Sequence, residues 1–175
     1  MEKSYKEYLQ HITTFIFDVD GVFTDGTIII DANGEMLRTM HTKDGFALKT
    51  AILQGYNVCI ISGGTNQAVK SRFTGLGVTD IYLGAHHKTI PFNEYITANN
   101  IKAENVLYMG DDIPDIPVMQ LVGLPTCPQD AVTEVKEVSK YVSNKKGGKG
   151  AVRDVLEQVL KVQGKWATEF DAKYD

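Results

Sequence analysis

Short apolar runs recur along the chain, and each one ends in a polar or glycine-rich turn. They cover residues 12–19, 57–61, 80–83, 105–109 and 123–127. Their apolar positions are continuous rather than alternating, which is typical of strands that are buried on both faces of a parallel sheet. We therefore predict that these runs form the strands of one central sheet.

Helical patterns separate the apolar runs. Leu48, Ala51, Ile52 and Gly55 follow the i, i+3, i+4, i+7 spacing of an amphipathic helix, and positions 152, 155, 156 and 159 repeat it. Alternating strands and helices imply right-handed crossovers, and hence an α/β fold with a doubly wound, Rossmann-like, mostly parallel sheet and helices on both faces. Ligands of such sheets bind at the carboxyl ends of the strands.

Capping residues suggest where two of the helices begin and end. Asp44 and Thr65 have side chains that suit an N-cap. Gly55 and Gly77 suit the left-handed position that follows a helix. We expect helices to run between these limits.

One segment, about residues 27–40, breaks the alternation of strands and helices. Two apolar stretches flank Asn33-Gly34, a pair that favours a type I′ β-hairpin turn. An isolated hairpin is marginally stable in water, so its apolar side chains need a partner surface. The apolar side chains concerned are Ile28, Ile30, Met36 and Met40. Their partner surface is either another subunit or the chain's own domain, and the sequence leaves both open.

Length and composition indicate one soluble domain. The 175 residues hold no long linker, so we expect a single domain over 1–163 and a mobile C-terminal tail over 164–175. The net charge of −4 argues against a nucleic-acid or membrane-surface partner, and no apolar run is long enough to cross a bilayer. Cys59 and Cys127 lack the spacing of metal ligands and suggest reduced thiols in the cytoplasm.

Acidic residues follow two of the predicted strands. Asp18 and Asp20 end the first apolar run, and Asp111, Asp112 and Asp115 follow the run at 105–109. Neighbouring carboxylates repel each other unless a cation lies between them or one of them carries a proton. An acidic helix N-terminus explains Asp112 or Asp115 alone, but not acids at two separate strand ends. The pattern predicts a Mg²⁺ site with oxygen ligands.

Two further strand ends offer groups that suit a phosphate. Ser62 and Gly63 begin the turn after residues 57–61 and supply a hydroxyl and free N–H groups. Lys88 follows the run at 80–83 and supplies a positive charge. Each has an ordinary alternative, because Ser-Gly-Gly also forms simple turns and a lone lysine is usually a solvated surface residue.

In combination these segments resemble the four motifs of the haloacid dehalogenase superfamily of phosphotransferases, in the same order along nearly the whole chain. The resemblance implies that Asp18 is a covalent nucleophile and Asp20 the acid/base. It also implies that Ser62, Gly63 and Lys88 bind phosphate. The ligands of Mg²⁺ would be Asp18, Asp20 through its main-chain carbonyl, and Asp111, with Asp112 and Asp115 in support.

The chain resembles the branch of this superfamily that has no cap domain. About 40 residues separate Gly21 from Ser62 and about 25 separate Ser62 from Lys88, fewer than the roughly 50 that a folded cap needs. The motif at 110–119 and the Gly-Gly-Lys-Gly segment at 147–150 resemble those of 3-deoxy-D-manno-octulosonate 8-phosphate phosphatases, enzymes of lipopolysaccharide sugar synthesis. That family implies a homotetramer in which neighbouring subunits cap the site and hairpins form the contact.

Two positions bear on the substrate. Phosphatases of nine-carbon keto-deoxy sugar acid 9-phosphates, a sibling branch, often carry a glutamate where this chain has Gly64, which favours the eight-carbon substrate. Arg72 matches an arginine of the octulosonate branch and suits a substrate carboxylate, although a surface arginine on a helix is the equal alternative.

A receiver-like phosphoacceptor or binding module is the alternative of another class. It also uses strand-end acids, a Ser or Thr and a Lys on a doubly wound sheet. Asp20 argues against it, because a lasting phosphorylation switch should lack a general acid that speeds turnover.

Overall fold

The computed structural model describes residues 4–166. Its strands are β1 (Thr14–Phe17), β2 (Ile29–Ile30), β3 (Met36–Leu37), β4 (Asn57–Ile61), β5 (Asp80–Tyr82), β6 (Val106–Met109), β7 (Leu124–Cys127) and β8 (Tyr141–Val142). Its helices are α1 (Tyr5–Leu9), α2 (Thr42–Leu53), α3 (Gln67–Gly75), α4 (Thr89–Ala98), α5 (Ile116–Met119), α6 (Thr133–Val138) and α7 (Ala151–Val162), with 3₁₀ turns at Ala103–Asn105 and Ile113–Asp115. Most of the tail over 164–175 lies outside the described residues.

Six strands form one parallel sheet in the order β5-β4-β1-β6-β7-β8. The chain winds outward from β1 in both directions, so the strand order reverses beside β1. That reversal is the point at which doubly wound sheets bind ligands. The predicted fold class is confirmed, and all five predicted strands are present.

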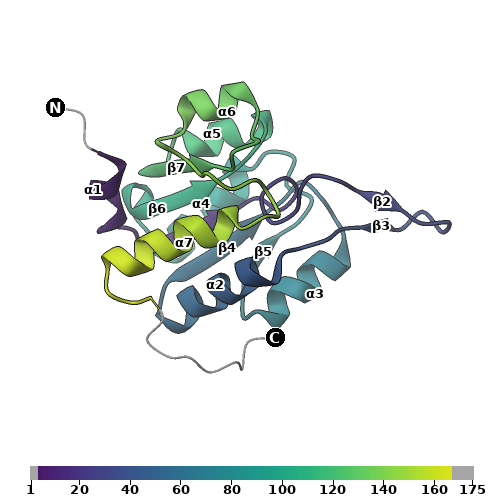
Figure 1. The fold of residues 1–175 in the computed structure, drawn as a ribbon, viewed down its shortest axis with the longest axis horizontal. Coiled ribbons are helices and arrows are strands. Elements are labelled where there is room, and N and C mark those ends of the chain that lie inside the picture. The colour runs from purple at the N-terminus through teal and green to yellow at the C-terminus, as the bar shows by residue number, and fades with distance from the viewer. Residues whose placement is uncertain (1–3, 167–175) are drawn as a thin grey trace.

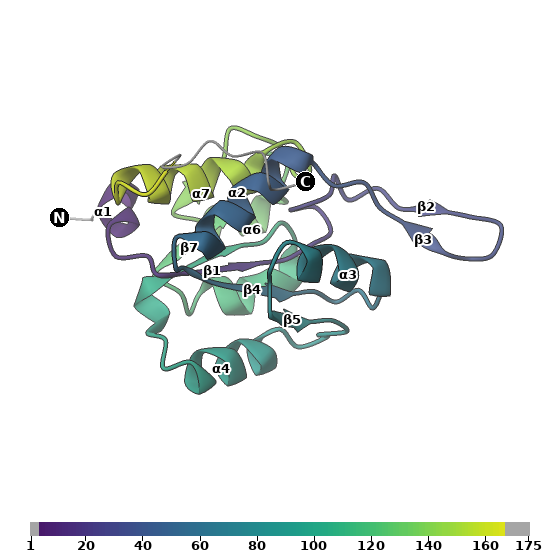
Figure 2. The same ribbon diagram turned by 90° about the horizontal axis from the view of Figure 1, so that it is seen from below.

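The sheet separates two hydrophobic cores because alternate side chains of each strand point to opposite faces. Phe15 and Phe17 of β1 pack with the helices α1, α2, α3 and α7 on one face. Ile16 packs with α4, α5 and α6 on the other. Figures 1 and 2 show α2 and α7 side by side over one face of the sheet and α4 beneath the opposite face. Burial on both faces explains why the strands read as unbroken apolar runs.

The caps of the helices differ from the expectation. The N-cap of α2 is His41 and that of α3 is Asn66, while Gly55 and Gly77 do follow the two helices with φ of +83° and +95°. Asp44 is buried and accepts a hydrogen bond from the main-chain N–H of Arg153 at 2.8 Å. Asp44 therefore serves the first turn of α7, whose own N-cap is a glycine without a side chain.

The hairpin of β2 and β3 is present, but its predicted turn type is wrong. Ile29 pairs with Leu37, which places Asp31 opposite Glu35 and leaves a loop of three residues between them. Asp31 Oδ1 accepts hydrogen bonds from the main-chain N–H groups of Asn33 and Glu35, and only Gly34 has positive φ. The aspartate side chain therefore stabilises a type I turn followed by a left-handed glycine, instead of a two-residue type I′ turn.

The hairpin projects away from the rest of the molecule, as both views show (Figures 1 and 2). Ile29 is 55% exposed, Ile30 70% and Leu37 52%. Met40, at the base of the hairpin, is the exception because it packs against the core of the domain. The chain's own domain therefore leaves most of the apolar hairpin surface uncovered. None of the helices in residues 4–166 is long and apolar enough to span a membrane.

Candidate active site

The ends of β1, β4 and β6 bring the predicted acidic and phosphate-binding residues together. Asp18 follows β1, Ser62 follows β4 and Asp111 lies two positions beyond β6. Parallel pairing holds these ends level, and the N–H of Asp18 donates to the carbonyl of Met109 at 3.1 Å. A cavity of about 410 Å³ opens there. Its lining includes the predicted residues Asp18, Asp20, Ser62, Gly63, Lys88, Asp111, Asp112 and Asp115.

Lys88 is a buried member of this site. Its Nζ lies 2.9 Å from Asp18 Oδ1 and 2.7 Å from Asp115 Oδ1. Burial works against the charged amine, but the two carboxylates outweigh that effect, so the pKa of Lys88 is raised. The surface-lysine alternative is therefore excluded by the burial of this side chain, which is 6% exposed.

Asp115 organises the loop that carries Asp111. Its Oδ1 accepts hydrogen bonds from Lys88 Nζ and from the Tyr108 hydroxyl at 2.6 Å, and its Oδ2 accepts from the main-chain N–H groups of Asp111 and Asp112. These four donors use the acceptor capacity of the carboxylate. Asp115 therefore has the contacts of a structural partner for Lys88 and the loop, and Tyr108 is a participant that sequence reasoning missed.

The carboxylates of Asp18 and Asp111 are arranged as cation ligands. One oxygen from each of Asp18, Asp111 and Asp115 lies within 4.8 Å of the others. Burial raises the pKa of Asp18 to about 7, with the charge of Asp115 adding to the rise. Burial and the charges of Asp18 and Asp115 raise the pKa of Asp111 to about 8. Crowded carboxylates of this kind fit a hard divalent cation such as Mg²⁺, whose charge removes their mutual repulsion.

The Asp20 side chain lies apart from this carboxylate cluster. Its oxygens accept hydrogen bonds from Arg38 Nε at 2.7 Å and Nη2 at 3.0 Å, while its side chain also lines the cavity. Arg38 was not singled out from the sequence, because a lone arginine in a hairpin strand carries no motif.

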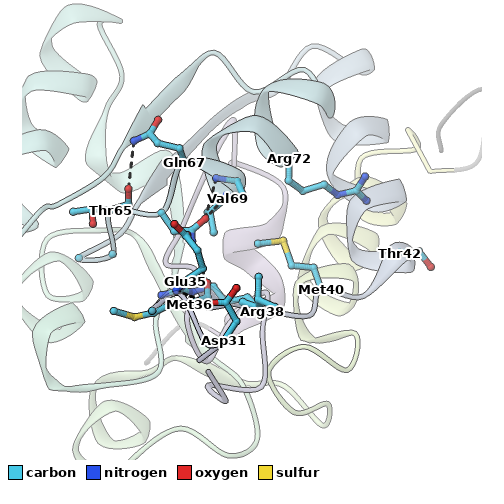
Figure 3. A pocket seen from close by; sticks show the side chains of 16 residues that line it. Asp31, Glu35, Met36, Arg38, Met40, Thr42, Thr65, Gln67, Val69 and Arg72 are labelled. Atoms are coloured by element: carbon cyan, nitrogen blue, oxygen red, sulfur yellow. Dashed lines mark hydrogen bonds between the residues drawn. The ribbon is translucent and has the colours of Figure 1, made fainter. Parts of the chain in front are cut away.

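A second, larger pocket of about 990 Å³ lies between the hairpin and α3, and it shares Gly63 and Gly64 with the first. Figure 3 shows Arg72 on the α3 side of this pocket and Arg38 on the hairpin side. Arg72 does not line the cavity of Asp18. Its predicted contact with a substrate carboxylate therefore requires a substrate that reaches past Gly63 and Gly64.

Comparison with known proteins identifies the family. Residues 66–156 match the family described as haloacid dehalogenase-like hydrolase. The 3-deoxy-D-manno-octulosonate 8-phosphate phosphatase KdsC of Escherichia coli K12 is 39% identical over 156 residues, which cover 89% of this chain and 83% of that protein.

The chain belongs to the haloacid dehalogenase-like hydrolase family.

Solved structures agree with this membership. The 3-deoxy-D-manno-octulosonate 8-phosphate phosphatase of Yersinia pestis superposes with a TM-score of 0.92 at 33% identity and covers 96% of this chain and 91% of its own. The corresponding phosphatase of Moraxella catarrhalis, solved in complex with a magnesium ion, a phosphate ion and a KDO molecule, gives 0.88 at 31% identity over 91% and 92% of the two chains. Membership of a hydrolase family favours an enzyme over the receiver-like alternative.

The Gly-Gly-Lys-Gly segment at 147–150 holds the loop that follows Asp20. Gly148 N donates to the carbonyl of Val22 at 2.9 Å, and Gly147 N donates to Asp130 Oδ1 at 2.9 Å. A Cβ at Gly147 would overlap the carbonyl oxygen of Gly21. The backbones of the two segments thus pack directly against each other, which only glycine permits at this position.

This contact predicts a specific loss of stability. Gly147→Ala should lower the free energy of unfolding by about 1–3 kcal/mol, because backbone must shift to accept the methyl group. Gly75→Ala is the matched control, since a Cβ there meets nothing within 4 Å. Urea denaturation followed by circular dichroism measures both. Equal midpoints for Gly147→Ala and the wild type would show that the two backbones are not in tight contact.

Proposed function

We propose that this chain is a Mg²⁺-dependent phosphatase that acts through an aspartyl-phosphate on Asp18 and releases phosphate from 3-deoxy-D-manno-octulosonate 8-phosphate. One observation carries the proposal: a buried lysine joins the Asp18 carboxylate, beside Asp111, in a cavity that Ser62 also lines. The relatives from Escherichia coli K12 and Yersinia pestis, which cover most of the chain, are named as phosphatases of that substrate.

The residues of the cavity have complementary roles. Asp18 Oδ attacks phosphorus, and the bond from phosphorus to the sugar oxygen breaks as the new one forms. Lys88 and the hydroxyl and N–H groups at Ser62 and Gly63 stabilise the charge on the phosphoryl oxygens. Asp20 gives a proton to the leaving alkoxide. It later accepts a proton from the water that hydrolyses the aspartyl-phosphate.

Asp18, Asp111 and the main-chain carbonyl of Asp20 are the proposed ligands of the metal, with Asp112 and Asp115 holding the loop in support. When bound, Mg²⁺ supplies positive charge that lets a carboxylate approach an anionic phosphate. The magnesium-containing structure of the Moraxella catarrhalis relative supports this choice of ion.

The first test is turnover of small sugar phosphates. Asp18→Asn should lower phosphate release at least about 10⁴-fold, because an amide is a poor nucleophile. Removal of divalent ions with EDTA should abolish release, and added Mg²⁺ should restore it. Asp80→Asn is the matched control, since Asp80 begins β5 at the opposite end of the sheet. Undiminished turnover by Asp18→Asn, or turnover that ignores Mg²⁺, would refute the mechanism.

The eight-carbon substrate is proposed over its nine-carbon relative because of Gly64. A Cβ at this position would lie 3.6 Å from Asp20 Oδ2, Ser62 Oγ and Arg38 Nη2. A longer side chain would therefore start close to the Asp20 carboxylate and the Ser62 hydroxyl, which both line the cavity. The KDO molecule in the Moraxella catarrhalis structure supports the same choice for the family.

This proposal predicts a preference in kcat/KM for the eight-carbon acid phosphate over the nine-carbon one. Gly64→Glu should lower the value for the eight-carbon compound by about tenfold or more, because it fills space beside Asp20. Phosphate release measured with both compounds decides the question. A wild type that prefers the nine-carbon compound would contradict the assignment.

The functional unit is proposed to be a cytoplasmic homotetramer in which neighbouring subunits cover the open site. The exposed apolar side chains of the hairpin support a subunit contact, since contiguous exposed apolar patches usually mark interaction sites. Cys59 and Cys127 are both buried, unpaired thiols, in keeping with a reducing compartment.

Light scattering tests the assembly. The wild type should have the mass of a tetramer at micromolar concentration, and Ile30→Asp with Leu37→Asp should give smaller species because charge replaces apolar contact area. Leu53→Asp is the control, as Leu53 is 58% exposed at the end of α2. A monomeric wild type would remove the argument for a cap supplied by neighbours.

A further inference from the structure

Arg38 makes a two-point contact with the carboxylate of Asp20. Nε donates to Oδ1 at 2.7 Å and Nη2 donates to Oδ2 at 3.0 Å. The arginine side chain is 8% exposed, whereas that of Asp20 is 32% exposed. The guanidinium thus lies on the inner side of the pair, and the carboxylate lies toward solvent and the cavity. A fork of this geometry fixes the plane of a carboxylate as well as its position.

The third nitrogen of Arg38 connects the pair to strand β3 of the hairpin. Nη1 donates to the carbonyl of Met36 at 3.0 Å, and the same carbonyl accepts a hydrogen bond from Asn66 Nδ2 at 3.0 Å. Asn66 also caps α3 through its Oδ1. Figure 3 shows Arg38 and Met36 together on the hairpin wall of the larger pocket. One arginine therefore joins the loop of Asp20, strand β3 and, through Met36, the start of α3.

The position of Arg38 argues against direct phosphate binding. Asp20 lines the cavity that holds Asp18 and Lys88, but Arg38 does not. Arg38 lines the larger pocket, and it also borders a small hollow together with Asp20 and Ser62. Three of its five N–H groups already donate to Asp20 and Met36. The side chain therefore acts on the cavity through Asp20.

We infer that Arg38 is the positioning residue for the proton-transferring carboxyl of Asp20, and that it links the orientation of this carboxyl to strand β3 of the hairpin. The inference rests on the proposed function. Each oxygen of Asp20 accepts one hydrogen bond from Arg38 and retains a second lone pair, which can carry the proton that Asp20 transfers. With both oxygens held, rotation of the carboxyl away from the leaving oxygen requires loss of two charge-assisted hydrogen bonds. Without Arg38, the carboxyl is free to rotate.

The test compares leaving groups. An alkoxide needs a proton from Asp20 when the phosphorus–oxygen bond breaks, whereas p-nitrophenolate leaves without one. Because kcat/KM covers only steps up to the first irreversible one, it reports formation of the aspartyl-phosphate and not its hydrolysis. Arg38→Met should lower kcat/KM for the sugar phosphate by about 100-fold, and that for p-nitrophenyl phosphate by less than about fivefold. Arg38→Lys should resemble Arg38→Met, since a single ammonium cannot form the fork.

The ratio of the two kcat/KM values is measured on one preparation, so partial misfolding cancels from it. Arg153→Met is the matched control, because Arg153 pairs with Glu157 on α7 and lies outside the cavity; it should leave the ratio unchanged. In an Asp20→Asn background, Arg38→Met should cause no further loss with the sugar phosphate, since both changes remove one function.

Equal losses on both substrates, no loss on either, or an additive loss in the Asp20→Asn background would overturn the inference. Those results would leave the proposed function intact, because the wild type still hydrolyses both compounds. Failure of the proposed function is a different result, in which the wild type releases phosphate from neither.

Discussion

The amine of Lys88 lies between two carboxylates, 2.9 Å from Asp18 Oδ1 and 2.7 Å from Asp115 Oδ1. The parallel sheet forces these acids together, because β1 and β6 are neighbours and their carboxyl ends meet at one edge. Buried charges of one sign are costly without a partner. Lys88 balances part of the negative charge and fixes Asp115, which in turn holds the loop of Asp111. The remaining excess of negative charge is what a cation site requires.

The sequence was informative where burial alone decides the structure. The strands are buried on both faces, so their continuous apolar runs predicted them, and acids at strand ends predicted the cavity. The short strand β8 was missed because Tyr141–Val142 is too brief for a pattern. The turn of the hairpin was mistaken because it depends on hydrogen bonds from Asp31, which a two-residue turn signal ignores.

Long-range polar contacts were the least accessible to sequence reasoning. Asp44 looked like a cap for its own helix, yet it serves α7, far away in the chain. Arg38 forms an ion pair with Asp20, which lies 18 residues earlier in the sequence. Neither residue indicates from the sequence that the other is its partner. Periodicity and motifs describe neighbours along one element. They carry no information about which two side chains the fold brings together, so Arg38 and Tyr108 emerged only from the structure.

The contact between Gly147 and Gly21 joins a late segment of the sequence to the loop that follows Asp20. Residues 147 and 148 come just before α7, which packs with α2 in one core on the same face of the sheet. A nascent chain that has already made Asp18, Ser62, Lys88 and Asp111 still lacks the segment that holds this loop. Synthesis therefore has to reach residues 147 and 148 before the contact that holds the loop after Asp20 can form, later than any residue that lines the cavity of Asp18.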